Sequence, residues 1–100
     1  MVKGWFIGDF EPTLYRTTDV EVAVKEYQQG DYEGFHHHKL ATEFTVIIDG
    51  TAMMSGHLLG PGDIVRIDPN ESTEFKALTN LKTVVVKLPG AKNDKYIDKI

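Results

Sequence analysis

The residues best suited to chemistry lie in the segment 30–50, GDYEGFHHHKLATEFTVIIDG. The segment holds three consecutive histidines and, a few positions later, one acid: His36, His37, His38 and Glu43. Side chains on an extended strand alternate between two faces, so His36 and His38 share one face while His37 points to the other. If Glu43 opens the following strand, two imidazoles and one carboxylate can converge on one point. Such a set of donors suits a divalent transition metal.

The elements that must position these side chains read as short strands separated by turns. Alternating apolar and polar residues, or β-branched and aromatic runs, mark the segments 17–28, 43–49, 64–67, 74–77 and 82–88. Turn signals separate them, among them Asp49-Gly50, which favours a two-residue hairpin. Residues 1–12 are expected to form an edge strand or an arm over an open end of the fold. About eight short strands without a sustained helical period predict an all-β antiparallel sandwich or barrel.

Length and composition narrow the class of protein. One hundred residues fit one small domain, so 1–100 is expected to be a single unit with a C-terminal tail at 91–100. Within this tail, residues 94–96 are expected to be a solvated terminus. The chain has no cysteine, which excludes disulfides, thiolate metal sites and cysteine nucleophiles. A net charge of −4 argues against binding to nucleic acid or to an anionic membrane surface. Without a signal peptide or a span of ~20 apolar residues, a cytoplasmic protein is expected.

The spacing within the segment 30–50 resembles the first signature motif of the cupin family. Five positions carry the resemblance, separated by five, one, four and six residues: Gly30, His36, His38, Glu43 and Gly50. The resemblance implies a single small jelly-roll barrel of about eight antiparallel strands, covering nearly the whole chain. It also implies that the two histidines and the glutamate point into the barrel as metal ligands. Fe, Mn, Zn or Ni is then the expected cofactor.

The second cupin motif is expected after Gly62-Asp63, and here the sequence departs from the family pattern. The family's proline falls at Asp68, beside Pro69, and its glycine falls at Asn70, which tolerates the positive φ that such a turn needs. The family's third metal-binding histidine falls at Thr73. A neutral hydroxyl is a poor ligand for a transition metal. The resemblance therefore leaves two histidines and one carboxylate, with open positions for a substrate or oxygen.

Further polar side chains are candidates for the wall of a pocket. Substrate-binding roles are assigned to Tyr27, Lys25, Thr73 and Thr45. If the valines of strand 17–28 pack between sheets, Lys25 and Tyr27 either face solvent or line the pocket, and exposure is the expectation for Lys25. Lys87 interrupts an apolar strand and is expected to face outward. A pocket with imidazole, carboxylate and hydroxyl groups suits a small polar molecule such as a sugar, a sugar phosphate or an organic acid.

Several functions are compatible with these residues. In the leading hypothesis His36, His38 and Glu43 are both metal ligands and catalytic residues, for isomerase or epimerase, lyase or dioxygenase chemistry. Without a metal, either histidine can act as a general base that Glu43 orients. The alternatives are a non-catalytic module that binds a metabolite or signal in a degenerate site, and a structural dimer with a vestigial pocket. Whether the protein is an enzyme stays open. A homodimer is expected because small jelly rolls expose sheet edges and an apolar face.

Overall fold

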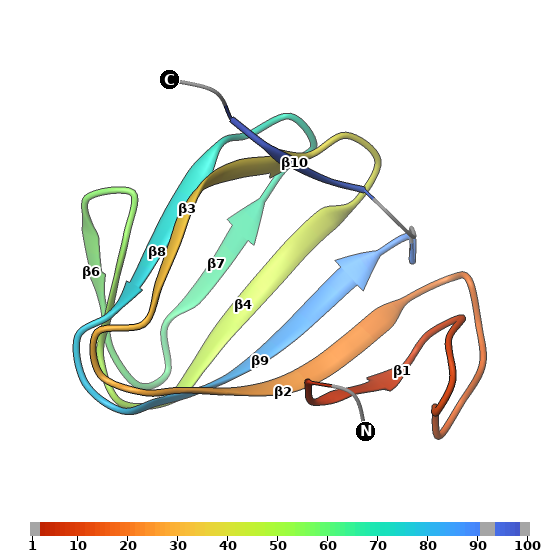
Figure 1. The fold of residues 1–100 in the computed structure, drawn as a ribbon, viewed down its shortest axis with the longest axis horizontal. Helices are drawn as coiled ribbons and strands as arrows, with labels where there is room; N and C mark the ends of the chain where they lie inside the picture. The colour runs from red at the N-terminus through yellow and green to blue at the C-terminus, as the bar shows by residue number, and fades with distance from the viewer. Residues whose placement is uncertain (1–2, 91–93, 99–100) are drawn as a thin grey trace.

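The computed structural model describes residues 3–90 and 94–98, and the regular elements within these ranges are all strands (Figure 1). In chain order they are β1 (Trp5–Ile7), β2 (Glu21–Tyr27), β3 (Tyr32–His38), β4 (Thr42–Asp49), β5 (Ala52–Met54), β6 (His57–Leu59), β7 (Ile64–Ile67), β8 (Thr73–Ala77), β9 (Leu81–Leu88) and β10 (Lys95–Ile97). In this part of the chain there is thus no helix of the length and apolarity that crossing a membrane requires.

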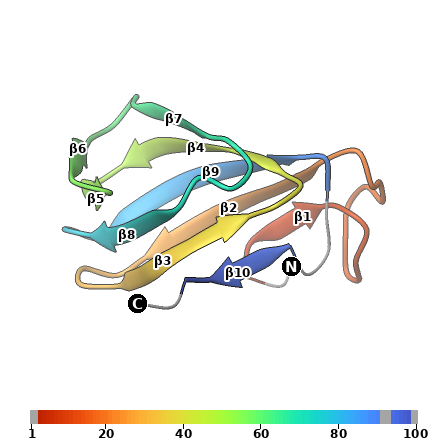
Figure 2. The same ribbon diagram turned by 90° about the horizontal axis from the view of Figure 1, so that it is seen from above.

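The strands form two five-stranded antiparallel sheets that pack face to face, as Figure 2 shows. One sheet has the strand order β1-β2-β9-β4-β7 and the other the order β10-β3-β8-β5-β6. The predicted all-β, jelly-roll architecture is confirmed. Ten strands are present instead of about eight, because β6 and β10 are only three residues long. Such short strands are too short to show a recognisable alternation.

The hydrophobic core lies between the two sheets. Its buried side chains come from both layers: Ile47, Ala52, Met54, Leu59, Ile67, Phe75, Ala77 and Leu81. The rings of Phe75 and Tyr27 pack with centroids 5.1 Å apart. Polar side chains are buried in the same interior, including two histidines and three threonines. Because a buried polar group costs free energy unless it is satisfied, these residues mark the place where a site is to be sought.

Two turns have the backbone conformation that their residue types predict. Gly50 closes the β4–β5 hairpin with φ of +88°, and a side chain there would lie 2.2 Å from the carbonyl oxygen of Asn80. Asn70 has φ of +67°, so it does replace a glycine of the second motif in a left-handed turn. Its N–H donates to the carbonyl of His38 at 2.6 Å. This hydrogen bond ties the turn before β8 to the strand that carries the histidines.

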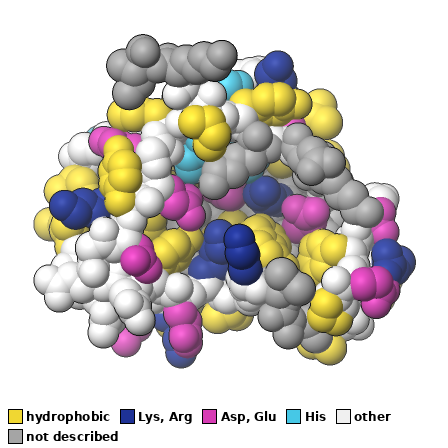
Figure 3. All heavy atoms as spheres, in the orientation of Figure 1, with side chains coloured by type: hydrophobic (Ala, Val, Ile, Leu, Met, Phe, Trp, Pro, Cys, Tyr) yellow, Lys and Arg dark blue, Asp and Glu magenta, His cyan; other side chains and the backbone are white. Residues whose placement is uncertain are grey.

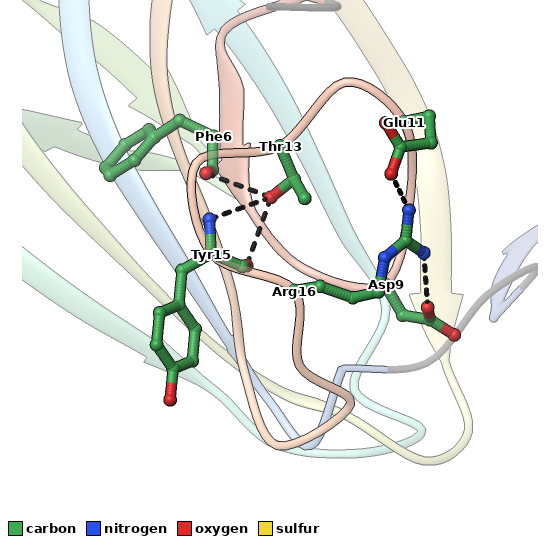
Figure 4. Close-up of polar contacts among 6 residues, drawn as sticks. All are labelled: Phe6, Asp9, Glu11, Thr13, Tyr15 and Arg16. Atoms are coloured by element: carbon green, nitrogen blue, oxygen red, sulfur yellow. Dashed lines mark hydrogen bonds and ion pairs between the residues drawn. The ribbon is translucent and has the colours of Figure 1, made fainter.

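The N-terminal segment begins with the edge strand β1, which a loop follows; residues 1–2 lie outside the described ranges. β1 pairs with β2, with Trp5 opposite Ala23. In this loop, the Thr13 hydroxyl bonds to the carbonyls of Phe6 and Tyr15, and Arg16 forms ion pairs with two acids, Asp9 and Glu11 (Figure 4). The exposed ion pairs contribute little stability by themselves.

Strand β2 turns the face opposite to its valines toward the interior. Ala23 is fully buried and Glu21 is buried, whereas Val24 is 40% exposed. Lys25 and Tyr27 therefore lie on the inner face, and the expectation that Lys25 is solvent-exposed is wrong. Alternation defines two faces of a strand but does not say which one is covered.

Two further expectations, on Lys87 of β9 and on the C-terminal tail, are wrong. On β9 the residues Thr83 and Val85 are buried, so Lys87 continues the inner face instead of the outer one. The tail is not a free, solvated terminus, because β10 pairs with β3 and Asp94 is buried, although Tyr96 and Ile97 are exposed. The remaining tail residues, 91–93 and 99–100, lie outside the described ranges.

Candidate metal centre

Two imidazoles of β3 lie inside the sandwich. His36 is 7% exposed and His38 5%, and their rings are perpendicular with centroids 5.9 Å apart. His37 lies on the outer side, where its Nδ1 is 2.6 Å from Oδ1 of Asp98. The strand therefore divides the three histidines as the alternation of side chains predicts. Figure 3 shows histidine, acidic and basic side chains gathered near the middle of the face that is seen in Figure 1.

A β-bulge in β3 adds an acid to the same interior. The pairing with β8 shifts between Glu33, opposite Phe75, and His36, opposite Thr73. An extra residue in one strand changes which face the next side chains take, so Glu33 and His36 both line the interior. Nδ1 of His36 is 2.8 Å from the carbonyl oxygen of Gly34. A carbonyl only accepts, so Nδ1 carries the proton and the lone pair of His36 is on Nε2.

The start of β4 brings a carboxylate to the histidines. Oε1 of Glu43 is 3.9 Å from Nε2 of His38, and both side chains are largely shielded from solvent. Burial raises the pKa of the Glu43 carboxyl, and the positive charge of Lys87 partly opposes this rise. Lys87 is the register partner of Glu43 on β9. Thr45, two residues further along β4, is buried on the same face.

The ring of His38 is held in its neutral form. Burial, together with the positive charges of Lys87 and His36, lowers the pKa of His38 to about 4. Its Nδ1 has no hydrogen-bond partner, and Oδ2 of Asp94 is 4.0 Å away. Neutral imidazole is the form in which histidine binds a metal.

Thr73 stands where the family's third metal-binding histidine falls in the sequence motif, and in the structure it lies beside the histidines. Thr73 lies opposite His36 across β3 and β8, and its side chain is buried. The other histidine of the chain, His57, is exposed on β6. Among residues 3–90 and 94–98, no three His, Asp or Glu side chains are already grouped closely enough to hold an ion. The centre therefore has no third imidazole beside His36 and His38.

A small cavity adjoins these groups. It measures about 30 Å³ and is lined by Lys25, Tyr27, Glu33, His36, Glu43, Thr45, Met54, Phe75 and Val85. The structure thus brings together five of the predicted site residues. His38 and Thr73 are not part of this lining, and Thr73 lines another cavity of about 460 Å³, with Met54 between the two. Two of the side chains that line the small cavity, Met54 and Phe75, belong to the hydrophobic core. The space is close to that of one water and far below the ~300 Å³ of a typical ligand pocket.

A larger groove opens from the same residues to the surface. It measures about 640 Å³ and is lined by Lys3, Gly4, Val24, Lys25, Glu26, Tyr27 and Glu33. Lys25, Tyr27 and Glu33 line both spaces, so they form the boundary between the groove and the cavity. The ammonium of Lys25 lies over the rings of Trp5 and Tyr27, at 5.6 and 5.9 Å from their centroids. These aromatic contacts hold a cation at the entrance.

The donor set fits a transition metal in chemistry, and one pair of its donors also fits in spacing. Two donors on one ion at about 2.0–2.2 Å each can be at most about 4.4 Å apart, and His38 and Glu43 meet this limit at 3.9 Å. The Nδ1 proton of His36 leaves Nε2 available as a donor, and the ring of His38 is neutral. What the structure lacks is convergence of all three donors on one point, which small side-chain rotations would have to supply.

Comparison with known proteins supports the fold. No protein-family model matches the sequence, and no curated protein matches it significantly. Solved structures do match. An uncharacterized conserved protein with a double-stranded β-helix domain from Klebsiella pneumoniae is 23% identical, with a TM-score of 0.74 over 83% of this chain and 74% of that chain. A cupin superfamily protein from Desulfitobacterium hafniense is 13% identical, with a TM-score of 0.67 over 72% and 69%.

A third similar structure belongs to a longer chain. The DMSP lyase DddQ from Ruegeria pomeroyi is 22% identical, with a TM-score of 0.76 over 93% of this chain and 49% of that chain. At these identities the likeness establishes the fold, and the cupin resemblance of the sequence is confirmed at that level: the chain has the double-stranded β-helix fold. Because one fold hosts many activities, its function has to be argued from the residues of the site.

Proposed function

We propose that this chain binds a divalent transition metal (Fe, Mn, Zn or Ni) through His36, His38 and Glu43, and a small polar metabolite beside it. The observation that carries the proposal is the buried carboxylate of Glu43, which faces Nε2 of the neutral His38 at 3.9 Å. A carboxylate and two imidazoles with open positions are typical of centres that bind a further ligand. A bound metal would supply Lewis-acid or redox chemistry, for isomerase or epimerase, lyase or dioxygenase reactions.

The other polar residues of the cavity and the groove indicate the chemical class of the metabolite. Lys25 at the entrance can pair with an acidic group of an organic acid or a sugar phosphate, and Glu33 beside it can accept hydrogen bonds from the hydroxyl groups of a sugar. Burial and the negative charge of Glu33 raise the pKa of Tyr27, so its hydroxyl stays protonated and donates a hydrogen bond. Thr45 and Thr73 add hydroxyl groups on the two sheets. Only the polar end of the molecule fits the cavity, and the rest lies in the groove outside.

Metal titration of variants tests the ligand set. His36→Ala and Glu43→Gln should each weaken binding of Zn²⁺ or Ni²⁺ by at least about tenfold in calorimetry, because each removes one of three donors. His37→Ala is the matched control, since it removes an adjacent histidine of the same strand on the outer face. Equal affinities for the native protein, His36→Ala and Glu43→Gln would refute the proposal.

A non-catalytic binding module is the second candidate function. Two observations favour it: threonine stands opposite His36, and Met54 and Phe75 leave a cavity of only about 30 Å³. Turnover of an organic acid or sugar phosphate that disappears in His36→Ala, at an unchanged melting temperature, would exclude this candidate. Binding of the same molecule without turnover would favour it. The DMSP lyase among the similar structures shows that the fold can carry lyase activity.

We also propose that the protein is a homodimer formed through the outer face of the first sheet. Apolar side chains adjoin one another on this face across four strands: Val22, Val24, Phe44, Val46, Ile64, Val84 and Val86. Charges beside this apolar patch are paired within the chain, Lys82 with Glu26 and Arg66 with Asp68. A contiguous exposed apolar patch is typical of a protein–protein interface. A second copy of the chain presents the same neutral, apolar surface and can therefore bury it.

Light scattering at micromolar concentration tests the dimer. The native protein should have twice the mass of its 11.2 kDa chain. Val46→Lys should give monomers because it places a charge in the middle of the patch, whereas Leu14→Lys, in the exposed loop that follows β1, should not. A monomeric native protein would refute the proposal.

We also propose that the protein is cytoplasmic, and fractionation of the source cells tests this location.

A further inference from the structure

The carboxylate of Asp94 lies at the turn that joins the two ligand-bearing strands. It is buried and accepts hydrogen bonds of 3.0–3.1 Å from three successive backbone N–H groups, those of Lys39, Leu40 and Ala41. These residues connect the end of β3 to the start of β4. The carboxylate of Asp94 therefore fixes the turn between the histidines and Glu43 through the backbone N–H groups of three successive residues.

Asp94 also faces one of the proposed ligands. Its Oδ2 is 4.0 Å from Nδ1 of His38, the nitrogen that has no hydrogen-bond partner. On the other side of the ring, Nε2 faces Glu43 at 3.9 Å. The imidazole thus lies between two carboxylates, one at the turn and one at the site. A histidine that binds a metal through one nitrogen usually donates its other N–H to a carboxylate or a carbonyl, which fixes its tautomer and orientation.

Hydrogen bonds hold the backbone on both sides of His38, so the orientation of its imidazole ring is what can still change. The carbonyl of His38 accepts a hydrogen bond of 2.6 Å from Asn70, and the residues that follow are held by Asp94. With the main chain fixed on both sides, rotation of the ring decides which nitrogen faces Glu43. The carboxylate of Asp94 is an anionic group that faces Nδ1, at 4.0 Å.

We propose that Asp94 is a positioning residue, whose carboxylate receives the Nδ1–H of His38 and directs Nε2 toward Glu43. The consequence for metal binding rests on the proposed function, but the orientation of the ring concerns the metal-free protein as well. Asp94 directly precedes β10, so the C-terminal strand completes a site whose ligands come from β3 and β4. Asp98, which directly follows β10 at its other end, offers a matched control, because it bonds to His37 and Ser72 on the outer side.

Nuclear magnetic resonance of the metal-free protein tests the orientation directly. In spectra that correlate ring nitrogens with ring protons, His38 should be the Nδ1–H tautomer. In Asp94→Asn the Nε2–H tautomer should become populated, whereas Asp98→Asn should leave His38 unchanged. A native His38 with its proton on Nε2 would overturn the proposal, and so would an unchanged tautomer in Asp94→Asn. If Asp94→Asn does not fold, the native spectrum alone decides.

Calorimetric titration with Zn²⁺ tests the consequence. Asp94→Asn should weaken binding by about 10–100-fold, the usual effect of losing such a partner of a ligating histidine, and Asp98→Asn by less than about twofold. Equal losses in both variants would mean that β10 only stabilises the fold and would overturn the proposal. A native protein that binds no metal would refute the proposed function, while the tautomer would still support or overturn the role of Asp94.

Discussion

Acid should destabilise the metal-free protein through His38. Burial lowers the pKa of His38 to about 4 in the folded protein, whereas an unfolded chain has the ordinary value near 6.5. Between these values the unfolded chain binds a proton that the folded protein does not, so the free energy of unfolding falls as the pH falls from about 6.5 to about 4. Above about 6.5 both states are neutral, and His38 contributes no pH dependence.

The size of this effect follows from the difference between the two pKa values. It corresponds to about 3 kcal/mol at most, and to about 2 kcal/mol once screening by nearby solvent is allowed for. The assay is urea unfolding at pH 7 and pH 4.5 in the presence of a chelator. The native protein should lose about 2 kcal/mol more than His38→Gln between these pH values. Comparison of the two cancels the contribution of Glu43, whose raised pKa acts with the opposite sign.

A control variant isolates the cause. His57→Gln removes an exposed histidine of β6 and should lose as much stability in acid as the native protein does. If the native protein and His38→Gln lost the same free energy between pH 7 and pH 4.5, the neutral, buried state assigned to His38 would be wrong.

Three further predictions follow from other parts of the structure. Thr73→His should tighten Zn²⁺ binding by at least about tenfold in calorimetry, because it supplies a third imidazole opposite His36; an unchanged affinity would contradict the predicted ligand set. Gly50→Ala should lower the free energy of unfolding by several kcal/mol, since its Cβ would lie 2.2 Å from a carbonyl oxygen, and Gly56→Ala, with similar φ but open space, by only about 1 kcal/mol. Equal losses would show that the close contact at Gly50 is relieved at little cost. Phe75→Ala should cost about 3–5 kcal/mol in urea unfolding, because it empties the centre of the core, whereas Phe35→Ala, at an exposed position of β3, should cost less than about 1 kcal/mol; similar costs would place the core elsewhere.

The architecture and part of the site were predictable because they depend on local patterns. Alternation along β3 places His36 and His38 on one face, and a register position relative to the second motif places Thr73 opposite His36. The residue preference of a left-handed turn predicts Asn70. The inferences on the histidines and on Asn70 use the geometry of an extended strand and of one turn, whereas the assignment of Thr73 came from the resemblance to the family's second motif.

Other features were not predictable from the sequence because they depend on which face is covered. Lys25 and Lys87 were expected outside and lie inside, since the outer face is formed by Val22 and Val24 of β2 and by Val84 and Val86 of β9. A strand with apolar residues on one side and polar residues on the other normally buries the apolar side. Here the interior around the candidate site is the polar side, and the apolar side is left for the proposed partner.

Glu33 and Asp94 were missed for different reasons. Glu33 joins the interior only through the bulge after it, and single-residue bulges leave no clear pattern in the sequence. Asp94 meets the N–H groups of a turn more than fifty positions earlier in the chain, so no local spacing connects them. Its environment becomes visible only when β10 is paired with β3.

Elemental analysis tests the central proposal most directly. The protein would be purified without a nickel column, incubated with Fe²⁺, Mn²⁺, Zn²⁺ or Ni²⁺ in turn, and desalted before measurement. The proposal predicts about one equivalent of at least one of these metals in the native protein and in His37→Ala, and almost none in His36→Ala or Glu43→Gln. Less than about a tenth of an equivalent of every metal in the native protein would contradict it.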